Sequence, residues 1–349
     1  MAGTDLTQTL AERVRAAHDA GTRLRIAGGG SKTWLGRPVA GETLDVSGHR
    51  GIVHYEPTEL VLTARAGTPL AEIEAALAER GQCLAFEPPH HGEYATLGGT
   101  VACNLSGPAR PYAGACRDFV LGVRILNGKG EVLRFGGEVM KNVAGYDVSR
   151  LMAGAQGTLG VLLEVSLKVL PRPETELTLA LEMDAETAVA RFNAWAGKPL
   201  PLSAACHVGE RAYVRLAGAE AAVRAARLRL GGEVIDDGAY FWRSVRELRH
   251  GYFSASGSLW RLSLPPTAAV DPSLHKFIDW GGAQRWVRSD TPQWEAAAAA
   301  GGHATRYRGD DRQQVFQPLT PGMMALHRRL KAAFDPKGIL NPGRLHPEL

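Results

Sequence analysis

Two glycine-rich segments, residues 96–107 and 154–161, constrain this chain more than any other feature of its sequence. In both, glycines alternate with small or β-branched residues, so the backbone can adopt positive φ and approach a ligand that Cβ atoms would keep away. A third run, residues 27–32, reads Ala-Gly-Gly-Gly-Ser-Lys. Successive unpaired amides form a concave nest for an anion. The three segments therefore favour a nucleotide cofactor with a diphosphate, and the alternative is that these glycines only form tight turns between strands.

The spacing of the glycines excludes two common nucleotide-binding motifs. Residues 27–32 lack the GxxxxGK[ST] spacing of a P-loop, and Arg37, Pro38 and Gly41 interrupt any helix that would follow. Residues 154–160 have the spacing of a dinucleotide fingerprint, but the apolar residues 161–170 after them predict a strand instead of a helix. We therefore reject a Rossmann domain.

Length and composition predict a globular protein of two domains. The chain has 349 residues, of which 45% are hydrophobic and 22% charged, and domains usually have roughly 100 to 200 residues. Its net charge of +4 comes from scattered arginines, so we expect no nucleic acid partner. No run approaches the ~18 apolar residues of a membrane helix. We expect a cytoplasmic protein without direct membrane insertion, so that any membrane association comes through a partner.

Cysteine and histidine spacing gives no sign of a metal site. The four cysteines show neither CxxC spacing nor a dense framework, which is typical of a reducing compartment. His90 and His91 are adjacent, and adjacent side chains in an extended chain point to opposite sides. We therefore expect no bound metal.

Periodicity and breaker residues predict an α+β fold. Before residue 171 we expect helices over residues 5–20 and 69–80, a short strand over 23–27, two strands within 51–66, a hairpin over 120–135 and a helix entered from residues 139–147. Residues 174–236 predict a βαββαβ order, the ferredoxin-like plan. Beyond it we expect helices over 239–250 and 320–334 and strands over 258–264, 283–289 and 302–308.

Several motifs resemble the FAD-linked oxidases of the vanillyl-alcohol oxidase/PCMH fold. They are residues 56–57, 66–67, 88–89, 97–104, 117–122, 141–147, 157–161 and 334–344. The resemblance covers nearly the full chain and is specific through residue 170 and at the C-terminus. Within the family, the chain is similar to the FAD-binding subunits of bacterial glycolate oxidase. A reductase of cell-wall precursors shares the fold, but the match at residues 341–344 points away from it.

The resemblance implies a domain plan and a set of residues around FAD. It predicts a PCMH-type, two-lobed FAD-binding domain at 1–171 (lobes about 1–65 and 66–171), a ferredoxin-like α+β cap on the substrate side at 172–314, and a C-terminal segment at 315–349 that returns to the FAD domain. Relatives often tether the flavin to a histidine where this chain has Ser31, so noncovalent FAD is expected. The predicted cofactor-binding residues are Ala27, Gly28, Gly29, Gly30, Ser31, Lys32, Pro88, Thr96, Leu97, Gly98, Gly99, Ala102, Asn104, Arg117, Asp118, Gly157, Gly160, Val161 and Asn341.

Flavin chemistry also needs a cation that holds the substrate's carboxylate. Trp242, Arg246 and Arg249 follow i, i+4, i+7 spacing on the expected helix 239–250 and would share one face. Arg246 and Arg249 are therefore the candidate catalytic residues, since paired guanidinium groups bind a carboxylate in bidentate fashion. The alternative is a solvated basic face opposite the apolar side of this helix.

A departure from the family shapes the expected function. Relatives that oxidise 2-hydroxy acids carry an HxGDGNxH segment, which this sequence lacks. The resemblance implies a sister FAD subunit that carries that segment and an iron–sulfur subunit that takes the electrons. The sequence thus predicts the FAD-binding subunit of a complex that oxidises a small 2-hydroxy acid, glycolate, to glyoxylate. The alternatives are a self-sufficient FAD dehydrogenase of another alcohol or hydroxy acid, and a non-catalytic scaffold.

Overall fold

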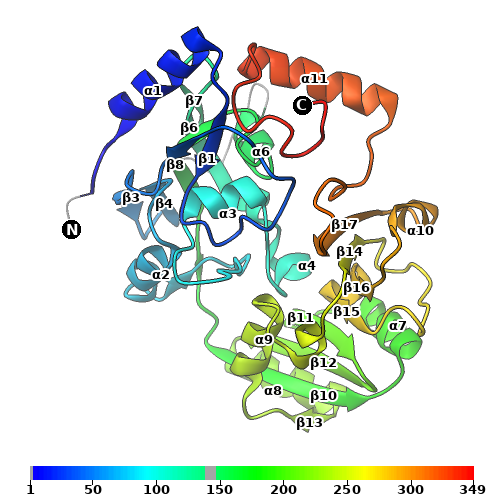
Figure 1. Ribbon diagram of the computed structural model, residues 1–349. Coiled ribbons are helices and arrows are strands. Elements are labelled where there is room, and N and C mark those ends of the chain that lie inside the picture. The colour runs from blue at the N-terminus through cyan, green and yellow to red at the C-terminus, as the bar shows by residue number, and fades with distance from the viewer. Residues whose placement is uncertain (1–2, 138–146) are drawn as a thin grey trace. The chain divides into compact units, whose positions relative to one another are not determined.

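The computed structural model describes residues 3–137 and 147–349, which form two compact units (Figure 1). Unit 1 comprises Met1–Leu105, Ala115–Pro171 and Pro318–Leu349, and unit 2 comprises Ser106–Gly114 and Arg172–Gln317. Most of the predicted motif at residues 141–147 lies outside the described residues. The assignment of residues 106–114 to unit 2 departs from the predicted plan. Its physical basis includes a hydrogen bond of 3.0 Å from Trp280 Nε1 to the carbonyl oxygen of Gly107.

A five-stranded antiparallel sheet organises unit 1. Its order is β3 (Ile52–Glu56), β4 (Val61–Arg65), β8 (Val161–Lys168), β6 (Val120–Leu126) and β7 (Val132–Gly136). The central strand β8 is apolar at most positions, and seven of its eight residues are buried. The predicted strand after the glycine segment 154–161 and the predicted hairpin over 120–135 are both confirmed. Because β4 pairs with β8, this sheet spans the predicted lobe boundary at residue 65.

Smaller elements complete unit 1. Strand β1 (Leu24–Ala27) pairs in parallel with β2 (Glu42–Asp45), and β5 (Gln82–Cys83) pairs with β9 (Leu170–Pro171). Helix α1 ends at Gly21, whose φ of 68° stops the helix as predicted. The helices are α1 (Thr7–Ala20), α2 (Leu70–Ala78), α3 (Leu97–Cys103), α5 (Cys116–Phe119), α6 (Val148–Met152) and α11 (Pro321–Phe334).

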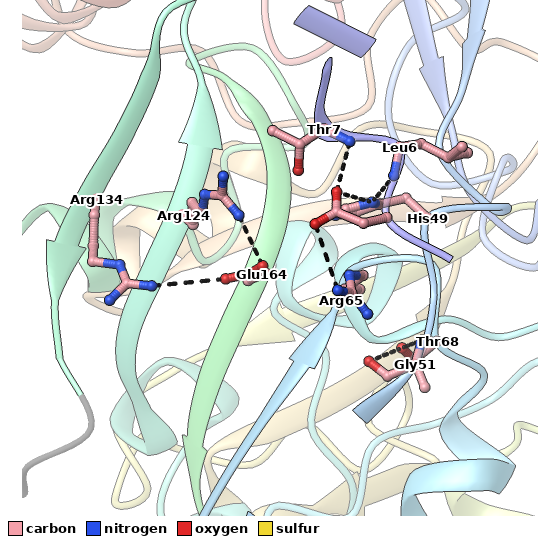
Figure 2. A network of polar contacts seen from close by, with 10 residues as sticks. Leu6, Thr7, His49, Gly51, Arg65, Thr68, Arg124, Arg134 and Glu164 are labelled. Atoms are coloured by element: carbon pink, nitrogen blue, oxygen red, sulfur yellow. Dashed lines mark hydrogen bonds and ion pairs between the residues drawn. The ribbon is translucent and has the colours of Figure 1, made fainter. Parts of the chain in front are cut away.

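Polar contacts join the N-terminal segment and the strands of this sheet (Figure 2). Glu164 on β8 accepts a hydrogen bond from Arg124 on β6 at 3.0 Å and lies 3.9 Å from Arg134 on β7. His49 is fully buried, and its Nδ1 accepts a hydrogen bond from the Leu6 amide at 2.9 Å. Burial lowers the pKa of His49, so its ring is neutral near pH 7.

Unit 2 is built on an eight-stranded sheet of order β13-β10-β12-β11-β15-β16-β14-β17. Its first half runs β10 (Thr175–Glu182), α7 (Ala185–Ala196), β11 (Leu202–Val208), β12 (Arg211–Gly218), α8 (Glu220–Leu230) and β13 (Glu233–Val234). This is a βαββαβ unit with strand order 4-1-3-2, so the predicted ferredoxin-like plan is confirmed.

Four further strands extend the sheet of unit 2. They are β15 (Phe277–Asp279), β16 (Gln284–Arg288), β14 (Leu259–Ser263) and β17 (His303–Arg308). The remaining elements are α4 (Arg110–Ala113), α9 (Gly238–Arg246), α10 (Trp294–Ala299) and the 3-10 turns η1 (Gly251–Ser254) and η2 (Trp280–Gly282). The α+β class is confirmed, whereas β15 and α10 were not predicted. Among the helices that the structure describes, none has the length and apolar character needed to cross a membrane.

Candidate cofactor-binding site

Unit 1 contains a cavity of about 420 Å³ beside the end of strand β1. All three glycine segments predicted from the sequence contribute to its wall, although they lie far apart along the chain. The predicted residues that line it are Ala27, Gly28, Gly29, Gly30, Ser31, Lys32, Thr96, Gly98, Gly99, Ala102, Gly157, Gly160 and Asn341.

The first glycine loop, residues 27–32, presents open backbone amides. The amides of Gly29, Gly30 and Ser31 donate to no acceptor in the described part of the chain. A Cβ at Gly29 would overlap the carbonyl oxygen of Tyr94, so the loop lies against the chain at residue 94 in a way that only glycine permits. These amides are the donors that an anion could use.

Helix α3 uses its glycines differently, which corrects the prediction of an open turn at residues 96–103. Thr96 caps the helix, and its Oγ1 accepts a hydrogen bond from the Gly99 amide at 3.3 Å. The Gly98 amide donates to the carbonyl oxygen of Ala66 at 2.7 Å, and a Cβ at Gly98 would lie 2.7 Å from the Ala66 Cβ. The amides of Gly98 and Gly99 are therefore satisfied within the protein, and the missing side chain of Gly98 allows α3 to pack on Ala66 at the end of β4.

The C-terminal segment fixes the walls of the cavity relative to one another. Asn341 donates from Nδ2 to the carbonyl oxygen of Gln156 at 2.6 Å, and its Oδ1 accepts from the Ile26 amide at 2.8 Å. Arg344 donates from Nε to Gln156 Oε1 at 3.0 Å and from Nη1 to the carbonyl oxygen of Arg37 at 2.7 Å. One short segment thus joins the glycine segment 154–161 to the chain on both sides of the first glycine loop.

A buried ion pair anchors that C-terminal segment. Lys331 Nζ donates to Asp335 Oδ2 at 2.8 Å, to the carbonyl oxygen of Thr158 at 2.7 Å and to that of Leu340 at 2.6 Å. Asp335 is 1% exposed, and its Oδ1 also accepts from the Ile339 amide at 3.1 Å. A buried charge pair is tolerated when further hydrogen bonds complete it, and here they hold residues 339–341 in place.

The electrostatic character of the cavity suits an anion. Its described lining includes Arg25, Lys32 and Arg344 and contains neither aspartate nor glutamate. Lys32 is 6% exposed, and its Nζ lies 3.2 Å from both Ser31 Oγ and the carbonyl oxygen of His90. Burial raises the pKa of the Cys103 thiol on the same wall, so this thiol stays protonated.

Six predicted residues do not line the cavity. Leu97 and Val161 are completely buried in the core, and Asn104 ends α3 with its Oδ1 accepting from the Arg117 amide at 3.1 Å. Asp118 accepts from the Ala115 amide at 2.8 Å and so caps α5. The six are Pro88, Leu97, Asn104, Arg117, Asp118 and Val161.

Sequence reasoning missed several residues of the wall. Ala66, Cys103, Ala155, Gln156 and Arg344 lie within segments that the sequence analysis quoted, so the signal for them was present. The others follow from tertiary contacts. The missed residues are Arg25, Ile26, Thr33, Pro38, Val39, Val46, Ala66, Cys103, Met152, Ala155, Gln156, Leu162 and Arg344.

The proposed pairing of Arg246 with Arg249 lacks the helical geometry on which it rested. Helix α9 ends at Arg246, and Leu248 has a φ of 54°, so Arg249 does not continue the helix face. Arg246 Nε donates to Glu247 Oε1 at 2.9 Å, while Trp242 is buried and donates to Thr178 Oγ1 at 3.0 Å. A carboxylate-binding role for the two arginines stays a prediction without a shared helix face.

The residues of the cavity fit a dinucleotide that carries a diphosphate. The first glycine loop offers unsatisfied amides beside the point where Gly29 lies against the carbonyl oxygen of Tyr94, and the cavity wall is positively charged. Amides and cations are the groups that bind phosphate oxygens. With the glycine segments converging on one cavity, unit 1 can hold such a cofactor without a P-loop.

Two protein families match parts of this chain. Residues 5–136 match the FAD binding domain family, and residues 309–345 match the C-terminal domain of FAD linked oxidases. The chain is 52% identical over 349 residues to the glycolate oxidase subunit GlcE of Escherichia coli (strain K12), covering 99% of both chains. It is 34% identical to the glycolate oxidase subunit GlcD of Bacillus subtilis (strain 168), over 37% of this chain and 27% of that one.

Solved structures share the fold at low identity. A p-cresol methylhydroxylase with substrate bound has a TM-score of 0.70 and 16% identity, covering 99% of this chain and 88% of that chain. An alkyldihydroxyacetonephosphate synthase has a TM-score of 0.67 and 17% identity, covering 96% and 74%. These likenesses confirm the predicted fold class.

Proposed function

Because the chain belongs to the family of the glycolate oxidase subunit GlcE, whose members are FAD-linked oxidoreductases, we propose that it is the FAD-binding subunit of a complex that oxidises glycolate to glyoxylate. The observation that carries this proposal is the identity of 52% along the whole length of both chains. The cavity in unit 1 supports it, since its open amides and positive lining suit the diphosphate of FAD.

Within the proposal, the residues of unit 1 hold the cofactor and FAD supplies the chemistry. The amides of Gly29, Gly30 and Ser31 would bind the diphosphate, with Lys32 adding a positive charge. FAD, when bound, supplies the acceptor for the two electrons removed from the substrate. Ser31 offers no imidazole for a covalent link, so we propose that FAD is held noncovalently.

We further propose that electrons leave through partner subunits. The four cysteines are Cys83, Cys103 and Cys116 in unit 1 and Cys206 in unit 2, whereas a [4Fe–4S] cluster takes four thiolates at one place. An iron–sulfur subunit and a sister FAD subunit would complete the complex. The complex would lie in the cytoplasm and reach the inner membrane through these partners.

Co-purification from the native host tests the proposal. A tag on this chain should recover two further subunits, flavin and iron–sulfur absorbance bands, and glycolate-dependent reduction of a dye. If the chain alone, loaded with FAD, reduces the dye with a hydroxy acid, it is a self-sufficient dehydrogenase. If the preparation is colourless and takes up no added FAD, the chain is a scaffold, and the proposal fails in both cases.

A further inference from the structure

One face of the sheet in unit 2 lies away from helix α10 and carries both rings and polar side chains, and on it Phe253 of η1 packs against the buried Trp286. Helix α10 packs on strands β14, β16 and β17 through a cluster that includes Trp260, Leu262 and Val287. Because successive side chains of a strand point to opposite faces, Arg261 and Ser263 of β14 lie on the face away from α10. The polar residues of β14 therefore share this second face.

Strand register places a histidine beside Arg261 on that face. Ser263 of β14 pairs with His303 of β17, and Arg261 pairs with Thr305. Arg261 and His303 are thus diagonal neighbours on one face, at a Cα separation of roughly 7–8 Å. The Arg261 guanidinium also lies over the Tyr307 ring, with its Cζ 5.3 Å from the ring centre.

Helix α4 brings a second arginine to the same region of unit 2. The Arg110 guanidinium lies over the Trp280 ring, with its Cζ 4.4 Å from the ring centre, and Trp280 is itself held by its hydrogen bond to Gly107. Trp280 directly follows Asp279, and Asp279 pairs with Gln284 in the cross-strand row that continues through Ser263 to His303. Arg110 therefore lies at one end of the row that has His303 at its other end.

Positive charge on this face exceeds the negative charge beside it. Arg261 makes neither a hydrogen bond nor an ion pair with any residue that the structure describes. Arg288 lies on the same face, two residues from the partner of Arg261, and covers Tyr252 at 4.8 Å. Asp279 lies in the cross-strand row of Gln284, Ser263 and His303, and its two oxygens accept from the Trp280 amide and from Gln284 Nε2.

We propose that Arg110, Arg261 and His303 form a binding site for a small carboxylate in unit 2. A guanidinium group binds a carboxylate through two parallel hydrogen bonds, and Arg261 has its donors available for this. Arg110 adds a second charge, and the exposed imidazole of His303 adds a hydrogen bond at the strand edge. That the carboxylate is glycolate rests on the proposed function, whereas the anion site itself does not.

Calorimetric titration of the full-length, FAD-loaded chain with glycolate tests this site. The neutral analogue glycolamide serves as the ligand control, and Arg224→Gln, on the exposed surface of α8, removes the same charge elsewhere in unit 2. We expect glycolate to bind and glycolamide not to bind. Arg261→Gln should weaken glycolate binding by about 10- to 100-fold, because a neutral amide replaces the charged guanidinium group, while Arg224→Gln should leave it unchanged.

Other results overturn the site and leave the proposed function to its own test. These results are equal affinity of the wild type and Arg261→Gln, binding of glycolamide as tight as that of glycolate, or no glycolate binding at all. His303→Asn is the second variant, which should weaken binding less than Arg261→Gln does. Co-purification with partner subunits reports on the proposed function independently, because it requires no ligand in unit 2.

Discussion

The first glycine loop and helix α3 have similar glycine-rich sequences, yet they use their glycines in opposite ways. In the loop, the amides of Gly29 and Gly30 have no acceptor in the described part of the chain. In α3, the amides of Gly98 and Gly99 are hydrogen-bonded to Ala66 and Thr96. Glycine content therefore shows where the backbone approaches something closely. Whether that neighbour is a ligand or another strand depends on tertiary partners far along the chain.

The largest expected effect comes from adding a side chain in the packed helix α3. Gly98→Val adds a branched side chain at a position where even a Cβ would lie 2.7 Å from the Ala66 Cβ and 3.0 Å from the Ala66 carbonyl oxygen. We expect the free energy of unfolding of the FAD-free protein to fall by about 3 kcal/mol or more, with FAD retention lost as a consequence. Urea denaturation and flavin absorbance measure the two effects.

The control for that variant is a helical glycine in open space. A Cβ at Gly322 in α11 meets no atom within 4 Å, so Gly322→Val should change stability by less than about 1 kcal/mol. If Gly98→Val unfolds at the same urea concentration as the wild type, α3 is not packed on Ala66 as described.

A substitution in the first glycine loop should lower cofactor affinity more than it lowers the stability of the protein. Gly29→Ala forces the first glycine loop away from the carbonyl oxygen of Tyr94 and so displaces the free amides. Losing about two hydrogen bonds to phosphate corresponds to about 3 kcal/mol, or roughly a 100-fold weaker FAD affinity. Flavin fluorescence titration of the FAD-free protein gives this value.

A neighbouring glycine distinguishes displacement from mere strain. A Cβ at Gly30 meets nothing within 4 Å, although its φ is 73°, so Gly30→Ala should cost about 1–2 kcal/mol through backbone conformation. We expect it to weaken FAD binding less than Gly29→Ala does. The opposite order would show that the amides of this loop do not bind the cofactor.

Substitution of Asn341 should have an intermediate effect on both stability and FAD affinity. Asn341→Ala leaves the buried Ile26 amide and Gln156 carbonyl oxygen without their partner, at a cost of about 1–3 kcal/mol in unfolding free energy. FAD affinity should fall with it because the two glycine segments lose their connection. Asn341→Asp keeps the acceptor for Ile26 and should be less damaging, and equal losses in the two variants would contradict this connection.

The smallest expected effect is a pH dependence of stability that arises from His49, close to the packed helix α3. The His49 carbonyl oxygen accepts from the Gly67 amide at 2.8 Å, next to the residue against which Gly98 packs. Burial lowers the pKa of His49 below 6.5 despite the nearby Asp5 and Glu164, while Arg65 and Arg124 act in the same direction as burial. The unfolded chain therefore takes up this proton first, so stability is complete above about pH 6.5 and declines as pH falls below it.

Comparing the wild type with His49→Asn isolates this effect from other histidines. The pKa of Asp5 is lowered to about 2 by hydrogen bonds from Thr7, so Asp5 stays ionised over the range tested. Urea denaturation at pH 7.5 and 5.5 should show a larger loss of stability in the wild type than in the variant. Equal losses would mean that protonation of His49 is not coupled to unfolding.

Much of the fold could be predicted because its signals are local. The turn in the hairpin of β6 and β7 and the stop of α1 at Gly21 follow from residues within a few positions. The nature of α3 could not be predicted, because its glycines form a helix only with the Thr96 cap and the contact with Ala66. Arg249 was misplaced for a related reason: the helix ends where Leu248 adopts positive φ, a backbone choice that its sequence does not mark.

In the candidate site, too, the features with local sequence signals could be predicted, and those that depend on distant contacts could not. The glycines on the cavity wall were identified from their spacing, but the contact of Arg344 with Gln156 joins positions 188 residues apart. The basic face of unit 2 was missed because Arg110 and Arg261 belong to segments that meet only in the folded unit. Sequence patterns thus predicted the glycine-rich backbone of the site better than they predicted its charged side chains.

The bridge from Asn341 to Ile26, which spans 315 positions, also sets the time at which the cavity can form during synthesis. The ribosome completes β1 and the first glycine loop long before it makes residues 339–344, so the nascent chain lacks the piece that closes the cavity walls together. The complete cavity wall can therefore assemble only after residues 339–344 have left the ribosome.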